Sequence, residues 1–358
     1  MGSNTTNDTS AGETTNAIQL SLYVTVIFVG SLGNCLVCLA IHRQKTRRPN
    51  EYFILNLALT DLGASVISIP LDLTELLTEK FPLGPLMCHV VYPVQTILMG
   101  ASVLTLLCLS YERHRAIVTP LKPRIEVKRA FLMIAATWLI SVMAVSPYAS
   151  ILHLEEEQCL EKWPHEIYTK IFTMSMFLLL YFIPLLIITA NYVRVMQKLF
   201  SERKGLRELF SGSDHHWCKH AKMRAEQNIK VVKVFVTAVV AFAICLLPNH
   251  VLWIWHDFGE GKNYSYFDKA VVYCNIMVYT NSAINPLIFG KLRLKDCCSV
   301  ENSESIRQGT TFLSKVASKA PSFGLRARAL SDINAPRPGF FKRLPQNEWR
   351  SDEQETSV

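Results

Sequence analysis

The sequence has little charge for its length. Asp, Glu, Lys and Arg make up 18% of its 358 residues, whereas hydrophobic residues make up 50%. The charges are sparse in seven long apolar stretches, each of about 20 residues or more, which is the length that a helix needs to cross a bilayer. Backbone polar groups cannot stay unpaired in lipid, so these stretches must be helices. The sequence therefore predicts an all-α, seven-transmembrane helix bundle within residues 18–290, with spans at 18–41, 53–77, 88–111, 131–152, 168–193, 229–255 and 268–290.

Other features are also missing, and their absence disfavours two further classes of membrane protein. The predicted spans hold few histidines, chiefly His250 and His89, whereas a membrane metal hydrolase needs several converging ligands. No internal repeat is visible, although repeats are common in secondary transporters. An enzyme and a transporter are therefore the less favoured alternatives, which metal analysis and ion-flux measurements would test.

The N-terminal segment lacks a cleavable signal peptide. Residues 1–17 are polar and rich in Thr and Asn, so we expect a disordered extracellular tail, and the first span must serve as the insertion signal. Asn4 and Asn7 in this tail, and Asn263 between the last two spans, each begin a glycosylation sequon. All three lie on the side predicted to be extracellular.

The basic residues alternate in position along the chain. The net charge is +8, and Lys and Arg gather after the first, third and fifth spans, whereas the other connections are richer in acid. The positive-inside rule then places the N-terminus outside and the C-terminus in the cytoplasm. Since the basic residues flank membrane spans, nucleic-acid binding is not expected. We predict a multi-pass protein of the plasma membrane.

Four of the ten cysteines carry specific predictions. Cys88 and Cys159 lie at the predicted outer face, which is oxidising, so we expect a disulfide between them. Cys297 and Cys298 follow a short basic segment at 291–298, which could form an amphipathic eighth helix that lies on membrane lipid. These two cysteines predict palmitoylation, with free surface thiols as the alternative.

The segment 299–358 is rich in Ser, Pro and Arg and predicts a disordered cytoplasmic tail. Phosphorylation of its serines and threonines would add the negative charge that arrestin-like partners recognise. The chain ends with Thr356 two residues before Val358, a pattern typical of ligands for PDZ-domain scaffolds.

Asp61 is the one acid deep within the second span, and a carboxylate is costly there unless it is paired. Other polar residues occur at corresponding depth, namely Ser102, Asn281, Ser282 and Asn285. Together they could hold an allosteric Na⁺ or could form a hydrogen-bond network without an ion. We expect no other cofactor.

Taken in order, these residues resemble the rhodopsin-like (class A) G-protein-coupled receptors over about residues 18–298. One set of motifs falls in each predicted span: Gly33-Asn34, Leu57-Ala58-Leu59-Thr60-Asp61, Cys88 with Glu112-Arg113-His114, Trp138, Pro184 with Tyr192, Phe242 with Cys245-Leu246-Leu247-Pro248, and Asn285-Pro286-Leu287-Ile288-Phe289. The departures from the family pattern are Glu-Arg-His for Asp-Arg-Tyr, Leu246 for Trp and Phe289 for Tyr.

The resemblance implies a switch that couples the bundle to a heterotrimeric G protein. Glu112 would pair with Arg113 until the 229–255 helix moves outward and Arg113 meets the G protein. With Leu246 in place of Trp, Phe242 would have to repack with its neighbours. The implied switch residues are Glu112, Arg113, Tyr192, Phe242, Pro248, Asn285 and Pro286.

The resemblance also narrows the ligand. Gln95 stands where amine receptors have an acid, and Tyr279 stands where opsins have a lysine. Gln95 looks like neuropeptide receptors of the orexin, neuropeptide FF and RFamide type. An acidic vestibule, with the run Glu155–Glu157, would favour a basic or amidated peptide.

The expected pocket residues are Asp72, Glu75, Gln95, His250, Trp253, Tyr273, Asn275 and Tyr279. Packing is the alternative role for each of them, and Trp253 could instead be an interfacial anchor. A lipid or a small molecule remains the alternative ligand.

Overall fold

The computed structural model describes residues 5–44, 46–209 and 216–290. The predicted surface helix at 291–298 and the predicted tail at 299–358 lie outside these residues. The same holds for Asn4, Cys297, Cys298, Thr356 and Val358, whose predicted roles stay predictions.

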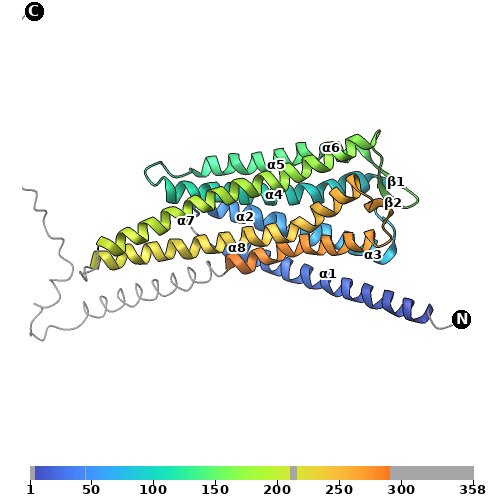
Figure 1. Cartoon of the computed structure of the whole chain (residues 1–358), viewed down its shortest axis with the longest axis horizontal. Helices are drawn as coiled ribbons and strands as arrows, with labels where there is room; N and C mark the ends of the chain where they lie inside the picture. Colours follow the sequence, from blue (N-terminus) through green and yellow to red (C-terminus); the bar gives the residue numbers. More distant parts are fainter. Residues whose placement is uncertain (1–4, 45, 210–215, 291–358) are drawn as a thin grey trace, which may run out of the picture. The chain divides into compact units, whose positions relative to one another are not determined.

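Seven helical segments form a bundle, as the sequence predicts (Figure 1). Six of the described helices are long and apolar enough to cross a membrane, and a more polar seventh helix covers residues 267–290. The elements are α1 (Thr5–His42), α2 (Pro49–Gly63), η1 (Ala64–Ser68), α3 (Ile69–Thr78), α4 (Gly84–Val118), α5 (Val127–Ile151), β1 (Leu152–Glu155), β2 (Gln158–Glu161), α6 (Glu166–Phe177), η2 (Leu178–Phe182), α7 (Ile183–Leu209), α8 (His216–Phe258) and η3 (Gly261–Asn263).

The helices extend further into the aqueous phase than the apolar runs do. α1 begins at Thr5, so the expectation of disorder at 1–17 is wrong for its described part. α7 and α8 likewise continue into the segment 200–225, which lies between the predicted spans at 168–193 and 229–255. Elongation of an existing helix costs little, and charged side chains such as Lys198 and Glu202, which pair at 3.5 Å, favour it.

Two spans contain a π-helical turn, and each turn ends two residues before a proline. η1 separates α2 from α3 and precedes Pro70, and η2 separates α6 from α7 and precedes Pro184. A proline ring clashes with the carbonyl four residues earlier, which here belongs to Val66 or Leu180 within the π turn. The wider turn relieves that clash without ending the helix.

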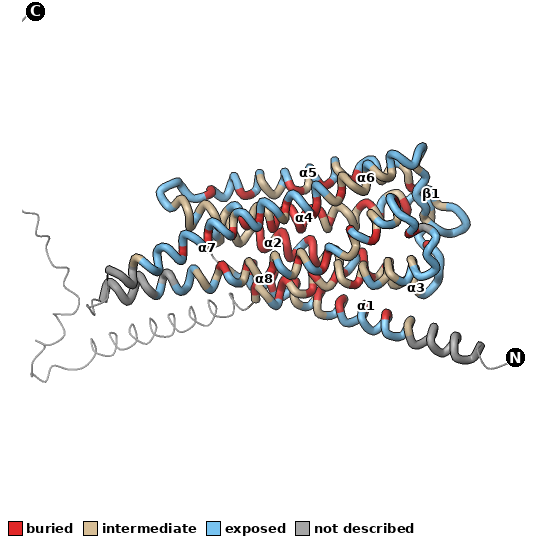
Figure 2. The backbone as a smooth tube through the Cα atoms, viewed as in Figure 1, coloured by how far each residue is buried: buried red, intermediate tan, exposed pale blue. Residues whose placement is uncertain are grey.

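α4 is the central helix of the bundle and contacts α2, α5 and α7. Figure 2 shows the buried residues concentrated along the facing sides of these helices. Asn56 of α2 links three of them, since its Nδ2 donates to Thr105 of α4 at 2.8 Å and its Oδ1 accepts from the Trp138 indole of α5 at 3.0 Å. One amide thus satisfies polar groups on two neighbouring helices inside the membrane.

A second link joins the first and last spans. Pro286 has no N–H, so the carbonyl of Ser282 loses its partner within the helix over 267–290. Asn34 of α1 donates to that carbonyl at 3.2 Å. Gly33 permits this approach, because a Cβ there would lie 2.8 Å from Pro286. The Gly33-Asn34 and Asn285-Pro286 motifs therefore belong to one contact.

Removal of the Asn56 amide should destabilise the bundle. In Asn56→Ala, the Trp138 N–H and the Thr105 hydroxyl lose partners in a site that water does not reach, at a cost of about 1–3 kcal/mol. Thermal unfolding of the purified protein, followed by tryptophan-independent thiol labelling, measures it. Trp138→Phe is the matched control and should cost less, since it orphans only one acceptor. An unchanged melting temperature in Asn56→Ala would contradict this account.

Candidate functional site

A polar cluster lies at the outer end of the bundle, centred on the half-buried Asp72 of α3. Its carboxylate accepts hydrogen bonds from Gln95 of α4 at 3.0 Å, from the Tyr279 hydroxyl at 2.8 Å and from Asn275 at 3.3 Å. We call these four residues the Asp72 cluster. Three spans therefore converge on one carboxylate, and four of the eight predicted pocket residues come together.

The local sequence explains how Asp72 reaches this position. The π turn η1 inserts about one extra residue per turn, which rotates the following side chains by roughly 100° relative to a continuous α-helix. Asp72 follows directly after η1 and Pro70. The Gln95 amide also approaches the carbonyl of Ser68, the last residue of η1, at 3.4 Å. The proline-induced irregularity thus turns Asp72 toward α4.

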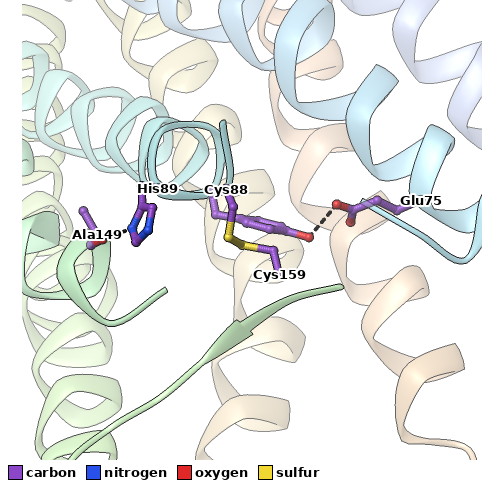
Figure 3. The surroundings of a disulfide bond; sticks show 6 residues. Glu75, Cys88, His89, Ala149 and Cys159 are labelled. Atoms are coloured by element: carbon purple, nitrogen blue, oxygen red, sulfur yellow. Dashed lines mark hydrogen bonds between the residues drawn. A yellow bond between two sulfur atoms is a disulfide. The ribbon is translucent and has the colours of Figure 1, made fainter. Parts of the chain in front are cut away.

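Glu75 lies one turn beyond Asp72 and accepts a hydrogen bond from the Tyr92 hydroxyl at 2.6 Å. This contact borders the Cys88–Cys159 disulfide, which confirms the predicted pairing and joins α4 to β2 (Figure 3). Its two Cα atoms are 5.7 Å apart. The disulfide therefore fixes the β1–β2 hairpin beside the wall that carries Glu75.

The hairpin itself was not predicted. Its strands pair antiparallel, with Leu154 opposite Cys159, and its two-residue turn places Glu156 and Glu157 at φ values of 46° and 63°. Positive φ at both positions matches a type I′ turn, whose usual residues are Asn and Gly. Two glutamates in this conformation carry no composition signal for a hairpin, which explains the omission.

The hairpin glutamates make the outer region less negative than the run Glu155–Glu157 predicts. Glu157 forms an ion pair with Lys80, and Glu155 forms one with Lys162. In contrast, no described Lys or Arg forms an ion pair with Asp72 or Glu75, whose recorded partners are amides and phenols. The uncompensated negative charge of this region therefore lies inside the bundle.

The remaining predicted pocket residues take other positions. His250 is buried against Phe177 and Tyr181, with ring centroids 5.9 and 5.1 Å away. Trp253 packs on His256 and Phe267. Tyr273 is 39% exposed. The structure joins none of these three to the Asp72 cluster by a recorded contact.

A second acidic centre, which sequence reasoning missed as a site, lies at the outer end of α8. Asp257 is only 6% exposed; it accepts from the Thr173 hydroxyl of α6 and contacts His256 Nδ1 at 2.7 Å. Glu161 of β2 accepts from the Trp163 indole at 2.8 Å. Asp257 follows His250 by seven residues, which is two helical turns on one face, and that spacing was the available signal.

Asp61 occupies a buried centre deeper in the bundle and is 1% exposed. Asn285 donates to its carboxylate at 2.8 Å, Ser102 lies at 3.5 Å, and the Ser282 hydroxyl lies within hydrogen-bonding reach. Asn281 lies one turn before Asn285 on the same helix. The structure thus brings together the residues that the sequence analysis grouped around Asp61, apart from a direct contact of Asn281.

The surroundings of Asp61 suit a small cation. A cavity of about 10 Å³ lies beside Asp61 and Asn285, but the rest of its lining is mainly apolar and includes none of Ser102, Asn281 and Ser282, so it offers room for about one water molecule and is not where the expected ligands meet. The side-chain oxygens of Asn281 and Asn285 are buried without a partner among the described residues. Carboxylate, hydroxyl and amide oxygens are the donors that hard cations prefer.

Toward the C-terminal end of α4, Glu112 and Arg113 form an ion pair with a 2.7 Å contact. The Arg113 guanidinium also lies 5.5 Å from the ring centroid of Phe235 on α8. Phe235 in turn contacts Tyr192 of α7 and Phe289, at 6.4 and 5.4 Å between centroids. Phe235 is therefore the residue through which α8 touches three other spans, and sequence reasoning missed it.

Between the two ends, Phe242 of α8 is fully buried and packs on Tyr181 of η2 at 5.8 Å. The Tyr181 hydroxyl donates to the carbonyl of Ala243 at 3.0 Å. Val103, Tyr181, Phe242 and Leu246 share one apolar cluster. Pro248 interrupts α8 just beyond it. Phe242 therefore packs in an apolar cluster that contains Leu246 in place of a tryptophan, and its repacking stays a prediction.

Comparison with known proteins agrees with this arrangement. The sequence profile described as "7 transmembrane receptor (rhodopsin family)" matches residues 33–289. Neuropeptide FF receptor 2 of Rattus norvegicus is 29% identical over 346 residues, which cover 89% of this chain and 78% of that protein. Neuropeptide Y receptor type 2 of Homo sapiens is 31% identical over 287 residues, which cover 76% of this chain and 72% of that protein. The predicted resemblance to neuropeptide receptors is confirmed, and the chain belongs to the rhodopsin family of seven-transmembrane receptors.

Proposed function

We propose that this receptor recognises an extracellular peptide and activates heterotrimeric G proteins. The observation that carries the proposal is the Asp72 cluster, a half-buried carboxylate that has only neutral partners among the described residues. The relatives named above, which are receptors for neuropeptide FF and neuropeptide Y, support the ligand class. The family is one of receptors rather than enzymes.

The chemistry of the cluster favours a cationic or amidated group. A guanidinium can donate two parallel hydrogen bonds to a carboxylate, and such pairs are strong where water is excluded. A terminal carboxamide would donate to Asp72 or accept from Gln95. Glu75 supplies a second acid one turn away. Asp257, near the C-terminal end of α8, supplies a third. These acids account for selection of a basic peptide over a neutral lipid.

Activation would move α8 outward at its cytoplasmic end. Phe235 leaves Arg113 in that movement, and the Glu112–Arg113 pair opens so that Arg113 meets the G protein. Pro248 provides the flexible point of α8, because its missing N–H weakens the helix there. Phe242 and Tyr181 repack in place of an indole. The remaining switch residues lie on the helices that face α8: Tyr192 on α7, and Asn285 and Pro286 on the helix over 267–290.

The same proposal includes the topology and the remaining partners. The chain would be a multi-pass plasma-membrane protein with its N-terminus outside, and Asn263, the exposed last residue of η3, would be a glycosylation site along with Asn4 and Asn7. Arrestin would bind the phosphorylated tail, and a PDZ domain would bind Thr356 and Val358. Cys297 and Cys298 would carry palmitate.

Neutralisation of Asp72 should reduce ligand potency. Asp72→Asn keeps the size of the side chain but removes the charge, and loss of one partner of a buried charge pair costs about 2–5 kcal/mol, or roughly 30- to 4000-fold. Second-messenger assays with basic, amidated peptides would measure it.

Asp268→Asn is the matched control for that measurement, since it removes an exposed charge at the start of the helix over 267–290. It should change potency by less than about threefold, as expected for a screened surface charge. Equal potency of both variants would exclude Asp72 as the peptide contact. A receptor that responds to lipids or amines and to no peptide would reject the ligand class.

Arg113 should be required for coupling and dispensable for folding. Arg113→Ala removes the group that would meet the G protein, so nucleotide exchange should fall at least about tenfold, in line with the loss of one charge-assisted contact. Surface expression should stay near wild type, and Arg113→Lys should recover part of the exchange. Loss of surface protein in Arg113→Ala would instead assign Arg113 a structural role.

Asp61 should mediate any effect of sodium. Suppose that Na⁺ binds the Asp61 carboxylate and stabilises the inactive arrangement. Agonist affinity of the wild type should then be lower in Na⁺ than in choline, whereas the affinity of Asp61→Asn should be the same in both salts. Radioligand or fluorescent-peptide competition in the two salts measures this difference. A response to Na⁺ that persists in Asp61→Asn would place the ion elsewhere.

A further inference from the structure

An aromatic surface that the signalling proposal does not use lies at the C-terminal end of α8, around the connection to the helix over 267–290. Trp255, Tyr264 and Tyr266 are all exposed there. The ring centroids of Trp255 and Tyr264 are 5.4 Å apart, and those of Tyr264 and Tyr266 are 5.9 Å apart. We call these three residues the Trp255 surface. Exposed rings that adjoin one another in this way often mark a place of interaction.

The connection holds these rings together, because it folds back tightly on the end of α8. The N–H of Gly259 donates to the Trp255 carbonyl at 3.0 Å, and the N–H of Tyr264 donates to the Gly261 carbonyl at 3.1 Å. A Cβ at Gly261 would lie 2.8 Å from the Cα of His256, so a larger residue would not permit this approach. The close turn therefore places the Tyr264 ring against Trp255.

Asn263 adjoins the Trp255 surface. It is the exposed last residue of η3 and begins the sequon Asn263-Tyr264-Ser265. The residue that follows it, Tyr264, contributes the central ring of the surface. A sugar attached to Asn263 therefore begins one residue away from an exposed aromatic ring.

The chemistry of the rings suits a sugar. The face of an aromatic ring carries partial negative charge, and the C–H groups on one face of N-acetylglucosamine form an apolar, weakly positive surface that can pack on it. Insertion among lipid headgroups is the other common use of exposed Trp and Tyr. A hydrophilic glycan on Asn263 would hold the neighbouring Tyr264 in water, which favours the sugar over the lipid.

We propose that the first N-acetylglucosamine of an N-linked glycan on Asn263 packs on the Trp255 surface. Attachment of the glycan is part of the proposed function, on which this packing rests. The sugar covers rings that belong to the end of α8 and to the connection, so it holds the connection against the helix. Since local opening of such a connection precedes wider unfolding, the packed sugar slows thermal unfolding of the receptor.

The test uses the full-length receptor with Asn4→Gln and Asn7→Gln, which leaves Asn263 in the only sequon of the chain. Cells that make only high-mannose glycans produce it. Endoglycosidase H then leaves a single N-acetylglucosamine on Asn263, whereas peptide N-glycosidase F removes the whole glycan. Unfolding at a fixed temperature, followed by thiol labelling, should be about two- to tenfold slower with the single sugar, the effect of one aromatic contact. The unglycosylated variant Ser265→Ala controls for the aspartate that the second enzyme creates.

Ring variants show whether the effect comes from the Trp255 surface. Tyr264→Ala keeps the sequon but removes the central ring, so the single sugar should no longer slow unfolding. Tyr264→Phe keeps the ring and should retain the effect. Tyr168→Ala removes an exposed ring of α6 and is the matched control, in which the sugar should act as it does with all rings present.

Three outcomes would overturn the proposal. A sugar that slows unfolding equally with Tyr264 and with Tyr264→Ala would mean that the ring serves packing or membrane anchoring instead. Equal unfolding rates with and without the sugar, when all rings are present, would exclude a stabilising contact. Mass spectrometry before trimming separates the two proposals: an Asn263 without a glycan rejects both the glycosylation and the packing, whereas a glycan that acts independently of Tyr264 rejects the packing alone.

Discussion

In the hydrocarbon core of a membrane, an amide or carbonyl without a hydrogen-bond partner is far more costly than it is in water. At two places the bundle meets this constraint by placing a side-chain amide of one span on polar groups of another. Asn34 takes over the carbonyl that Pro286 leaves free, and Asn56 satisfies groups on α4 and α5. The motifs that characterise the family in this chain are therefore largely the polar groups that make a kinked helical bundle possible in lipid.

The helix over 267–290 links the three functional levels of the bundle. Its outer part reaches Asp72 through Asn275 and Tyr279, its middle part reaches Asp61 through Asn285, and its inner end places Phe289 against Phe235. A rigid displacement of this single helix would change all three contacts. The first two levels contact the second span, at Asp72 and Asp61, and the third contacts α8 at Phe235, so such a displacement would affect two other spans.

Much of this arrangement was predictable. Apolar length predicted the spans, and the expected location of Cys88 and Cys159 on an oxidising face predicted the disulfide. The grouping of Asp61 with Ser102 and Asn285 followed from depth alone, since residues at equal depth in a bundle meet. Depth does not determine rotation about the helix axis, which is why His250 and Trp253 pack away from the Asp72 cluster. Helix ends were also missed, because charged segments such as the start of α8 carry no hydropathy signal yet propagate well as helix.

The ion pairs of the hairpin have a kinetic consequence. Lys80 and Lys162 neutralise Glu157 and Glu155, two of the three consecutive hairpin glutamates, so the hairpin exerts only a weak long-range attraction on an approaching cation. Ionic strength should then have little influence on how fast a basic molecule arrives. Discrimination among basic ligands must instead occur after binding, at the acids inside the bundle that have no cationic partner. The dissociation rate of each ligand, and hence its residence time, then determines selectivity.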